Sequence, residues 1–429
     1  MASISATHDQ PVRKKAAGLP FDGVLLVIVG ALLAIGLMMV YSATFDWSYQ
    51  QYGDPNTIFL LQLRSLGIGL VAMFVVARIN YRWWRWLALG VMVAAVALLG
   101  WVLLKGSSAF GAQRSVFKGS VQPSELAKFA TVVYLAAWLS SKGDKIRQWG
   151  YGIIPFGMII GFVTALILLQ PDLSAAATIV IVASIMFFMA GADLIQMGLV
   201  GLAGSGVAWL VLQASETGRK RLVDYLAGMQ DIMQASWQVK QAAIAFVNGG
   251  VFGRGLGQSY QKFGFLPTPH TDSIFAIIGE ELGLVGCLVV VALFVALIWR
   301  GFKIASEAKD GMGAILAAGI VCWVAIEALI NVAVMVGALP VAGNTLPFIS
   351  YGGSSLVMMM TAMGVLLSIS RRSDTDAVPR KTRSAGMLGD YAPRSTTGGA
   401  PAGETKRNAT FDFGGRDRRG SLSRSSRRE

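Results

Sequence analysis

Charge is scarce in this sequence. Only 14% of the 429 residues are Asp, Glu, Lys or Arg, against roughly a quarter in soluble globular domains. Histidine occurs twice and cysteine twice, which excludes the usual zinc sets of Cys and His and a disulfide-rich scaffold. The two cysteines, Cys287 and Cys322, fall inside apolar runs, and we interpret them as small core residues.

Long apolar runs, in contrast, are abundant. Hydrophobic residues make up 54% of the chain, and they gather in runs such as VLLVIVGALLAIGLMMVY and CLVVVALFVALIW. These runs approach or reach the roughly 20 residues that cross a hydrocarbon core as a helix. The strands of a membrane barrel alternate in polarity and would not form them. The sequence therefore predicts an all-α polytopic membrane protein.

Ten transmembrane helices are predicted, with a large extracytoplasmic loop at 214–272 between the seventh and the eighth. Residues 1–20 are predicted to be a cytoplasmic tail, and 21–370 to be the membrane domain. Residues 371–429 hold 14 basic and 7 acidic residues, a net charge of +7, which predicts a disordered cytoplasmic tail near the anionic inner leaflet. The predicted spans are 23–42, 58–77, 83–104, 121–139, 151–169, 172–190, 194–213, 273–299, 312–336 and 346–369.

The basic residues predict the orientation of these spans. Lys and Arg recur at 13–15, 78–85, 142–147, 300–309 and 371–372, and all of these segments fall on one side. Because cytoplasmic loops carry an excess of Lys and Arg, both termini are predicted to lie in the cytoplasm.

Two loops on the opposite side are also basic, 105–120 and 214–272. A long loop translocates whatever its charge, which accounts for the second loop but poorly for the first. An anionic partner outside, such as a pyrophosphate or a lipid headgroup, would account for both. The two interpretations stay open at this stage.

Ionisable groups inside spans are costly and usually face a partner or a cavity. Glu125 and Lys128 lie three residues apart at the start of the fourth span, so they form either a capping ion pair or part of a site. Asp172 follows a proline between two apolar runs and is interpreted as a helix N-cap. Glu327 and Asn331 share one helix face, either for helix–helix hydrogen bonding or for function.

Two glycine-rich segments cannot continue a helix. The stretch 339–355, LPVAGNTLPFISYGGSS, predicts either a re-entrant, cavity-lining turn or a flexible polar loop. Five glycines fall between 249 and 257, where they allow positive φ and close backbone approach. Neither a preceding strand nor a following lysine–serine pair is present there, so a nucleotide-binding loop is a weak interpretation.

The segment PTPHTDSIFAIIGEELG, 267–283, carries most of the titratable chemistry. Asp272 lies at the start of the eighth span, where it is either an N-cap or a general base toward a hydroxyl. Helix geometry places Glu280 about 12 Å deeper and about 80° around from Asp272, and Glu281 about 180° around. At most one of the two glutamates is therefore expected to share the site of Asp272.

Five motifs in order resemble one family, the SEDS (shape, elongation, division and sporulation) glycosyltransferases. They are QPSELAK, QPDLSAA, GGVFGRGLGQSYQK, LPTPHTDSIFAIIGEELGLVG and NVAVMVGALPVAGNTLPFISYGGSS. The resemblance covers about residues 20–370. It implies polymerisation of lipid II into peptidoglycan at the outer face of the cytoplasmic membrane, with undecaprenyl pyrophosphate as the leaving group.

The resemblance also implies roles for individual residues. Asp272 corresponds to the family's essential aspartate and is expected to deprotonate the acceptor sugar hydroxyl. No metal-binding residue is assigned, although a divalent cation, Mg or Mn, is expected to assist the leaving group. Substrate binding is expected for Glu125, Lys128, Arg114, Lys262, His270, Thr271 and Ser350.

The family further implies a class B penicillin-binding protein as partner, together with divisome or elongasome proteins, and no nucleic acid. The long outer loop and cytoplasmic extensions favour a division-type, FtsW-like member. The alternatives are a RodA-like polymerase for elongation, a lipid II flippase and a non-catalytic division scaffold. Departures from the family pattern leave the sugar pocket undefined; they are Ser115, Thr268, Pro269, Ser273 and Glu327.

Overall fold

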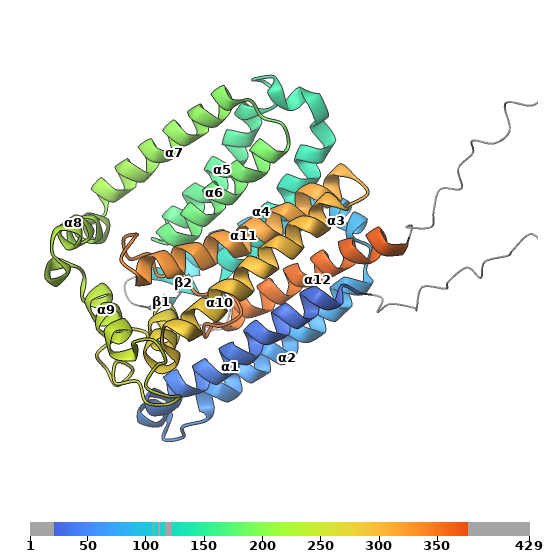
Figure 1. Ribbon diagram of the computed structural model, residues 1–429. Coiled ribbons are helices and arrows are strands. Elements are labelled where there is room, and N and C mark those ends of the chain that lie inside the picture. Colours follow the sequence, from blue (N-terminus) through green and yellow to red (C-terminus); the bar gives the residue numbers. More distant parts are fainter. Residues whose placement is uncertain (1–20, 106, 110–111, 116–121, 376–429) are drawn as a thin grey trace, which may run out of the picture. The chain divides into compact units, whose positions relative to one another are not determined.

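A computed structural model describes residues 21–105, 107–109, 112–115 and 122–375 of the chain (Figure 1). These residues belong to one compact unit, Met1–Val378. The predicted N-terminal tail and nearly all of the predicted C-terminal tail lie outside the described residues.

Ten long helices follow the ten predicted spans in order. Seven spans in the described part are long and apolar enough to cross a membrane, while α5 and α6 are shorter apolar helices and α4 is not among the seven. The count of ten spans therefore stays a prediction. The ten helices are α1 (Gly23–Tyr52), α2 (Thr57–Arg78), α3 (Trp84–Lys105), α4 (Pro123–Lys142), α5 (Ile153–Leu168), α6 (Leu173–Met189), α7 (Leu194–Ala214), α10 (Ile274–Ser306), α11 (Gly311–Met335) and α12 (Gly353–Thr375).

The connections carry the remaining elements. Between α7 and α10 lie α8 (Glu216–Gln230), η3 (Ile232–Gln234) and α9 (Trp237–Gly249). The short 3₁₀ helices η1 (Tyr81–Trp83) and η2 (Gly143–Arg147) lie before α3 and after α4. An antiparallel hairpin of β1 (Ser107–Ala109) and β2 (Ala112–Ser115) modifies the all-α prediction. Glycines and serines around this hairpin disfavour a helix.

The core of the bundle is formed around α11. This helix packs against α4, α6 and α10, and Trp323 on it is fully buried. In Figure 1 the helices α10, α11 and α12 lie between the pair α1 and α2 and the pair α5 and α6. A Cβ at Gly364 would lie 2.5 Å from the carbonyl oxygen of Met73, so this glycine permits the close contact of α12 with α2. Little of α7 is buried, and it packs against α6 and α8.

Three predicted boundaries differ from the helix ends by seven or more residues. One is the end of α10, which continues past residue 299 to Ser306. The first helix does not stop at residue 42 but continues to Tyr52, because the polar and aromatic residues after the apolar run are still helical; Gly53 ends it with a φ of 72°. The last helix begins at Gly353 rather than 346. Residues 346–352 form a turn instead, in which the Ser350 hydroxyl accepts from the amide of Leu346 at 2.8 Å.

Candidate functional site

The carboxylate of Asp272 lies at the entry to α10, in the last turn before the helix. The helix N-cap is Ser273, so Asp272 itself does not cap α10. Its Oδ1 accepts hydrogen bonds from the hydroxyls of Thr268 and of Thr271, the latter at 3.0 Å. Its Oδ2 accepts from the Gln238 amide on α9 at 3.3 Å. In the described part of the chain Asp272 forms no ion pair.

The backbone that carries Asp272 is held from two other elements. Asn331 on α11 donates to the Asp272 carbonyl at 2.8 Å and to the Asn344 carbonyl at 2.6 Å. Ser350 donates to the Thr271 carbonyl at 2.5 Å, and the Tyr351 amide donates to the His270 carbonyl at 2.8 Å. The segment that links α11 to α12 thus fixes the position of the aspartate.

This linking segment is packed rather than flexible. Leu346, Phe348 and Ile349 are buried, and the φ of Phe348 is 65°. A non-glycine residue holds that conformation only where its surroundings determine it. The structure supports the interpretation of 339–355 as a turn that lines the interior.

His270 lies in an apolar, aromatic environment next to the aspartate. Its ring stacks on Trp47 of α1, with ring centroids 4.6 Å apart, and only 7% of the residue is exposed. Burial lowers the pKa of the imidazole to about 4, and the Asp272 carboxylate opposes that shift. His270 is therefore neutral at neutral pH and packs as a flat aromatic ring.

This pKa predicts a pH dependence of stability. Between about pH 6.5 and about pH 4 the unfolded chain binds a proton on His270 that the folded chain does not bind. The contribution to stability is complete above pH 6.5 and is lost as the pH falls toward 4, by about 3 kcal/mol. Thermal unfolding of detergent-solubilised protein at several pH values measures it. The loss on acidification should be smaller in His270→Gln; an equal loss in both proteins contradicts the prediction.

A second polar cluster lies between α4 and α11. Lys128 forms ion pairs with Glu125 at 2.7 Å and with Glu327 of α11, and Trp323 donates to Glu327 at 2.9 Å. Exposed fractions of these charged side chains are 7% or less. Among the described residues, one carboxylate oxygen of each glutamate has no hydrogen-bond partner. The predicted Glu125–Lys128 pair is confirmed and is extended by Glu327.

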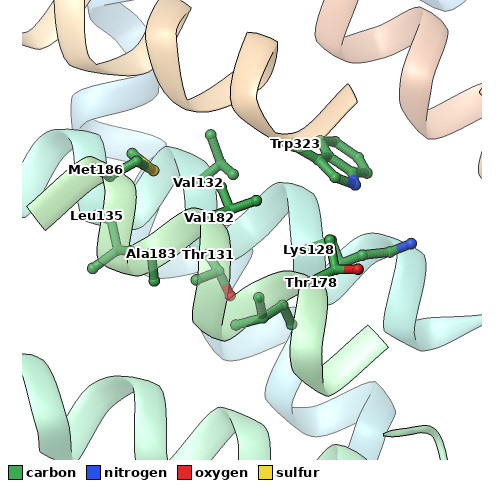
Figure 2. A pocket seen from close by; sticks show the side chains of 10 residues that line it. Lys128, Thr131, Val132, Leu135, Thr178, Val182, Ala183, Met186 and Trp323 are labelled. Carbon is green, nitrogen blue, oxygen red and sulfur yellow. The ribbon is translucent and has the colours of Figure 1, made fainter. Parts of the chain in front are cut away.

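A small cavity adjoins this cluster. Lys128 and Trp323 line it with Thr131 and Thr178, between α4, α6 and α11, and its volume is about 10 Å³ (Figure 2). That space corresponds to about one water molecule. Because Glu327 and Asn331 lie one turn apart on α11, the same helix contacts both this cluster and the backbone of Asp272.

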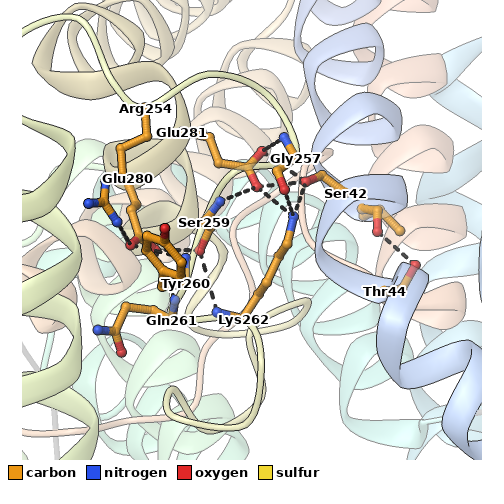
Figure 3. Close-up of polar contacts among 11 residues, drawn as sticks. Ser42, Thr44, Arg254, Gly257, Ser259, Tyr260, Gln261, Lys262, Glu280 and Glu281 are labelled. Atoms are coloured by element: carbon orange, nitrogen blue, oxygen red, sulfur yellow. Dashed lines mark hydrogen bonds and ion pairs between the residues drawn. The ribbon is translucent and has the colours of Figure 1, made fainter.

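Glu280 and Glu281 are bound by residues 249–262, which we call the glycine segment (Figure 3). Its amides at Gly257 and Ser259 donate to Glu281, and those at Tyr260 and Gln261 donate to Glu280, at 3.0–3.4 Å. Ser42 of α1 donates to Glu281 at 2.7 Å. The glycine segment therefore binds carboxylates of its own chain, and neither glutamate contacts Asp272.

Backbone geometry explains the glycines of this segment. At Gly253 the φ is 80°, and a Cβ would lie 2.2 Å from the Glu281 carbonyl oxygen. Opposite it, α10 is interrupted at Gly283, with φ 69° and ψ −167°. The interruption frees backbone groups of α10, and the glycine segment bonds to them; for example, Arg254 donates its amide to the Glu280 carbonyl at 3.0 Å.

Replacing Glu281 by glutamine tests the role of these contacts. The change removes the charge that Lys262 pairs with at 3.0 Å and weakens the acceptor for Ser42 and Gly257. Local opening of the glycine segment should become easier by about 1–3 kcal/mol. Hydrogen exchange at the Gly257 and Ser259 amides should then accelerate, whereas the exposed Glu216→Gln should leave it unchanged. Unchanged exchange in Glu281→Gln would show that the carboxylate does not hold the segment.

The structure brings four of the predicted site residues together: Asp272, Thr271, His270 and Ser350. Glu125 and Lys128 belong to the second polar cluster, between α4 and α11. Lys262 forms an ion pair with Glu281, and the Lys262 side chain is 7% exposed. Arg114 lies in β2, and its side chain lies outside the described part of the structure.

Three contacts of the aspartate were not predicted. Thr268 and Gln238 donate to its carboxylate, and Asn331 donates to its backbone carbonyl. Asp172 caps α6 as predicted, accepting from the Ala175 amide at 3.3 Å. Both cysteines are buried and free.

No group of three or more His, Cys, Asp or Glu that could hold a metal ion occurs among the described residues. In the part of the chain that the structure describes, Asp272 is the one carboxylate at this site, and the side chains that contact it are hydroxyl and amide donors. A protein-only cation cage therefore does not fit this site, and no reaction step is assigned to a metal.

Comparison with known proteins identifies the family. The family model FtsW/RodA/SpoVE, described as cell cycle protein, matches residues 23–375. The chain belongs to this family. The resemblance predicted from the motifs is confirmed, and its match includes all ten long helices.

Members of the FtsW/RodA/SpoVE family match most of this chain over nearly all of their own length. Stage V sporulation protein E of Bacillus subtilis (strain 168) is 42% identical over 357 residues, 82% of this chain and 97% of that protein. A probable peptidoglycan glycosyltransferase FtsW of Geobacter metallireducens is 39% identical over 357 residues, 82% and 95% of the two chains. A chain from a peptidoglycan synthase complex, solved in work on the coordination of polymerization and crosslinking, superimposes with a TM-score of 0.67 at 25% identity, covering 83% and 100% of the two chains.

Proposed function

We propose that this protein is a peptidoglycan glycosyltransferase that polymerises lipid II, with Asp272 as general base. The observation that carries the proposal is the environment of the Asp272 carboxylate. Two threonine hydroxyls fix its Oδ1, and among the described residues a single amide, at 3.3 Å, donates to its Oδ2. One oxygen is thus oriented and the other retains capacity to accept a proton.

The proposed reaction forms one glycosidic bond. The acceptor sugar hydroxyl transfers its proton to Oδ2 of Asp272 as the hydroxyl oxygen attacks C1 of the lipid-linked glycan. The bond from C1 to the pyrophosphate oxygen breaks, and undecaprenyl pyrophosphate leaves with the electron pair. A Cβ at Gly343 would lie 3.9 Å from Oδ2, so a glycine at this position leaves room for the acceptor on that side.

The basic residues support the proposed orientation. One end of the bundle carries basic residues in or next to the helix ends, namely Arg78, Arg82, Lys145, Arg300 and Lys303. Asp272 lies at the opposite end of α10 from Arg300. We therefore place the basic end and both termini in the cytoplasm and Asp272 at the outer face of the cytoplasmic membrane.

The proposed partner is a class B penicillin-binding protein, a transpeptidase. The structural similarity to a chain of a peptidoglycan synthase complex supports it. The relatives named FtsW favour the division-type alternative over the RodA-like one. For a division-type member we propose divisome proteins as further partners. For the RodA-like alternative the further partners would be elongasome proteins. No nucleic acid is involved.

A divalent cation, Mg or Mn, is proposed only as a companion of the substrate. Magnesium in proteins is commonly held by one or two carboxylates together with substrate phosphates. The pyrophosphate of lipid II would supply most of the ligands of the cation, since the described residues offer no acidic cluster that could hold a metal ion.

The test uses purified full-length protein with its transpeptidase partner in proteoliposomes containing labelled lipid II. Polymerised glycan is the expected product. Movement of lipid II across the bilayer without polymer would instead establish the flippase alternative, and neither activity would establish the scaffold alternative. Either result overturns the proposed activity.

A further inference from the structure

A cleft of about 790 Å³ lies at the basic end of the bundle, far along the helices from Asp272. Its walls come from three places: Arg82, Arg85 and Trp86 of η1 and α3, Ser140 of α4, and Asp310 and Gly311 at the start of α11. The volume falls within the range of pockets that hold a small molecule or a lipid headgroup. None of these residues belongs to the clusters described above.

The acidic residue in the cleft, Asp310, already accepts three hydrogen bonds. Oδ1 of Asp310 accepts from the Tyr81 hydroxyl at 3.1 Å and from the Gly313 amide at 2.8 Å. Its Oδ2 accepts from Nε of Arg82 at 3.0 Å. Asp310 thus caps α11 and neutralises Arg82, and it leaves the charge of the second arginine unbalanced.

Arg85 is that second arginine. It is exposed within the cleft and forms no ion pair in the part of the chain that the structure describes. Its guanidinium presents donors in a planar fork that matches the oxygens of a phosphate. The cleft therefore carries one net positive charge and a donor set for an anion.

Exposed tryptophans place the cleft at the level of lipid headgroups. Trp83, Trp86, Trp149 and Trp299 all lie at the basic end, and Trp86, inside the cleft, is 88% exposed. Tryptophan is enriched where the bilayer meets water, with its ring among the headgroups. Basic pockets between membrane helices at this level suit anionic headgroups.

The chain's own tails are poor candidates to fill the cleft. Residues 371–429 carry a net charge of +7, and the first 20 residues include Arg13, Lys14 and Lys15 against one aspartate. Like charges would repel them from Arg85. The charge of the cleft instead favours an anion from the surrounding bilayer.

We propose that this cleft binds the phosphate headgroup of an anionic phospholipid. Arg85 pairs with the phosphate, the Trp86 ring packs against the glycerol and the upper acyl chain, and the Arg82–Asp310 pair forms the floor. A free inorganic phosphate would share the Arg85 contact but would gain nothing from Trp86, and this difference separates the two sources.

The experiment measures lipid binding to the full-length protein by native mass spectrometry. Phosphatidylglycerol is titrated against zwitterionic phosphatidylethanolamine for the wild type, Arg85→Gln, Arg85→Lys and Trp86→Ala. The matched control is Lys145→Gln, an exposed lysine at the same end that does not line the cleft. A parallel titration uses inorganic phosphate alone.

The expected result is a loss of phosphatidylglycerol affinity of about tenfold in Arg85→Gln. Arg85→Lys, which keeps the charge but lacks the planar fork, should lose less affinity than Arg85→Gln and shows that the fold tolerates change at this position. Trp86→Ala should weaken the lipid but not inorganic phosphate. An equal loss in Lys145→Gln, or equal binding of both lipids, would mean a diffuse basic surface and overturn the proposal. Tight inorganic phosphate binding that Trp86→Ala leaves unchanged, without lipid selectivity, would also overturn it.

Discussion

Replacing Asp272 by asparagine is expected to lower the rate of glycan polymerisation by about 10²–10⁴-fold, the usual contribution of a positioned general base. Asparagine has the same shape, and its amide oxygen can still accept from Thr268 and Thr271. The hydrogen-bonded turn before α10 should therefore remain intact. What is lost is an oxygen that can take the proton of the acceptor hydroxyl.

Labelled lipid II, the transpeptidase partner and the purified variant give the measurement. The loss should appear in kcat rather than KM, since the change affects the transition state more than the bound ground state. Asp224→Asn, an aspartate of α8 in the segment between α7 and α10, is the control and should polymerise at the wild-type rate. A fully active Asp272→Asn would remove Asp272 from the mechanism and leave the polymerase assignment to other residues.

The parts of this fold that could be predicted are those set by local sequence. Apolar runs give the helices in order, and Asp172 caps α6 because an aspartate after a proline suits a helix start. The ends of α1 and α12 could not be predicted from hydropathy. The C-terminal end of α1 depends on polar residues that remain helical. The start of α12 depends on the hydrogen bond between the Ser350 hydroxyl and the Leu346 amide.

The candidate site shows the same division. Helix geometry correctly keeps Glu280 and Glu281 from both sharing the face of Asp272, but it does not show that both bind the glycine segment. Gln238 reaches Asp272 from α9, 34 positions away in sequence. A glutamine within the predicted loop 214–272 gives no signal in the sequence, because its role depends on a tertiary contact.

Replacing Lys128 by methionine should lower the free energy of unfolding by about 3–5 kcal/mol, the usual cost of removing one partner from a buried ion pair. Methionine fills a similar volume, so the effect comes mainly from charge. Glu125 and Glu327 would then face one another between α4 and α11 without the cation that bridges them, and each already has one oxygen without a partner in the described residues.

Denaturation of the solubilised protein, followed by tryptophan fluorescence, measures this loss. Lys145→Met, an exposed lysine outside the bundle core, should change stability by less than about 0.5 kcal/mol. Adding Glu125→Gln and Glu327→Gln to Lys128→Met should recover much of the loss, because the unpaired charges are removed with their partner. If the triple variant is no more stable than Lys128→Met alone, the lysine stabilises the bundle through its packing against Trp323 rather than through the two carboxylates. The polymerisation activity of a folded triple variant separates a structural role of the cluster from a role in catalysis. Retained activity makes the cluster a structural link between α4 and α11. Lost activity connects the cluster, through α11 and Asn331, to the position of Asp272.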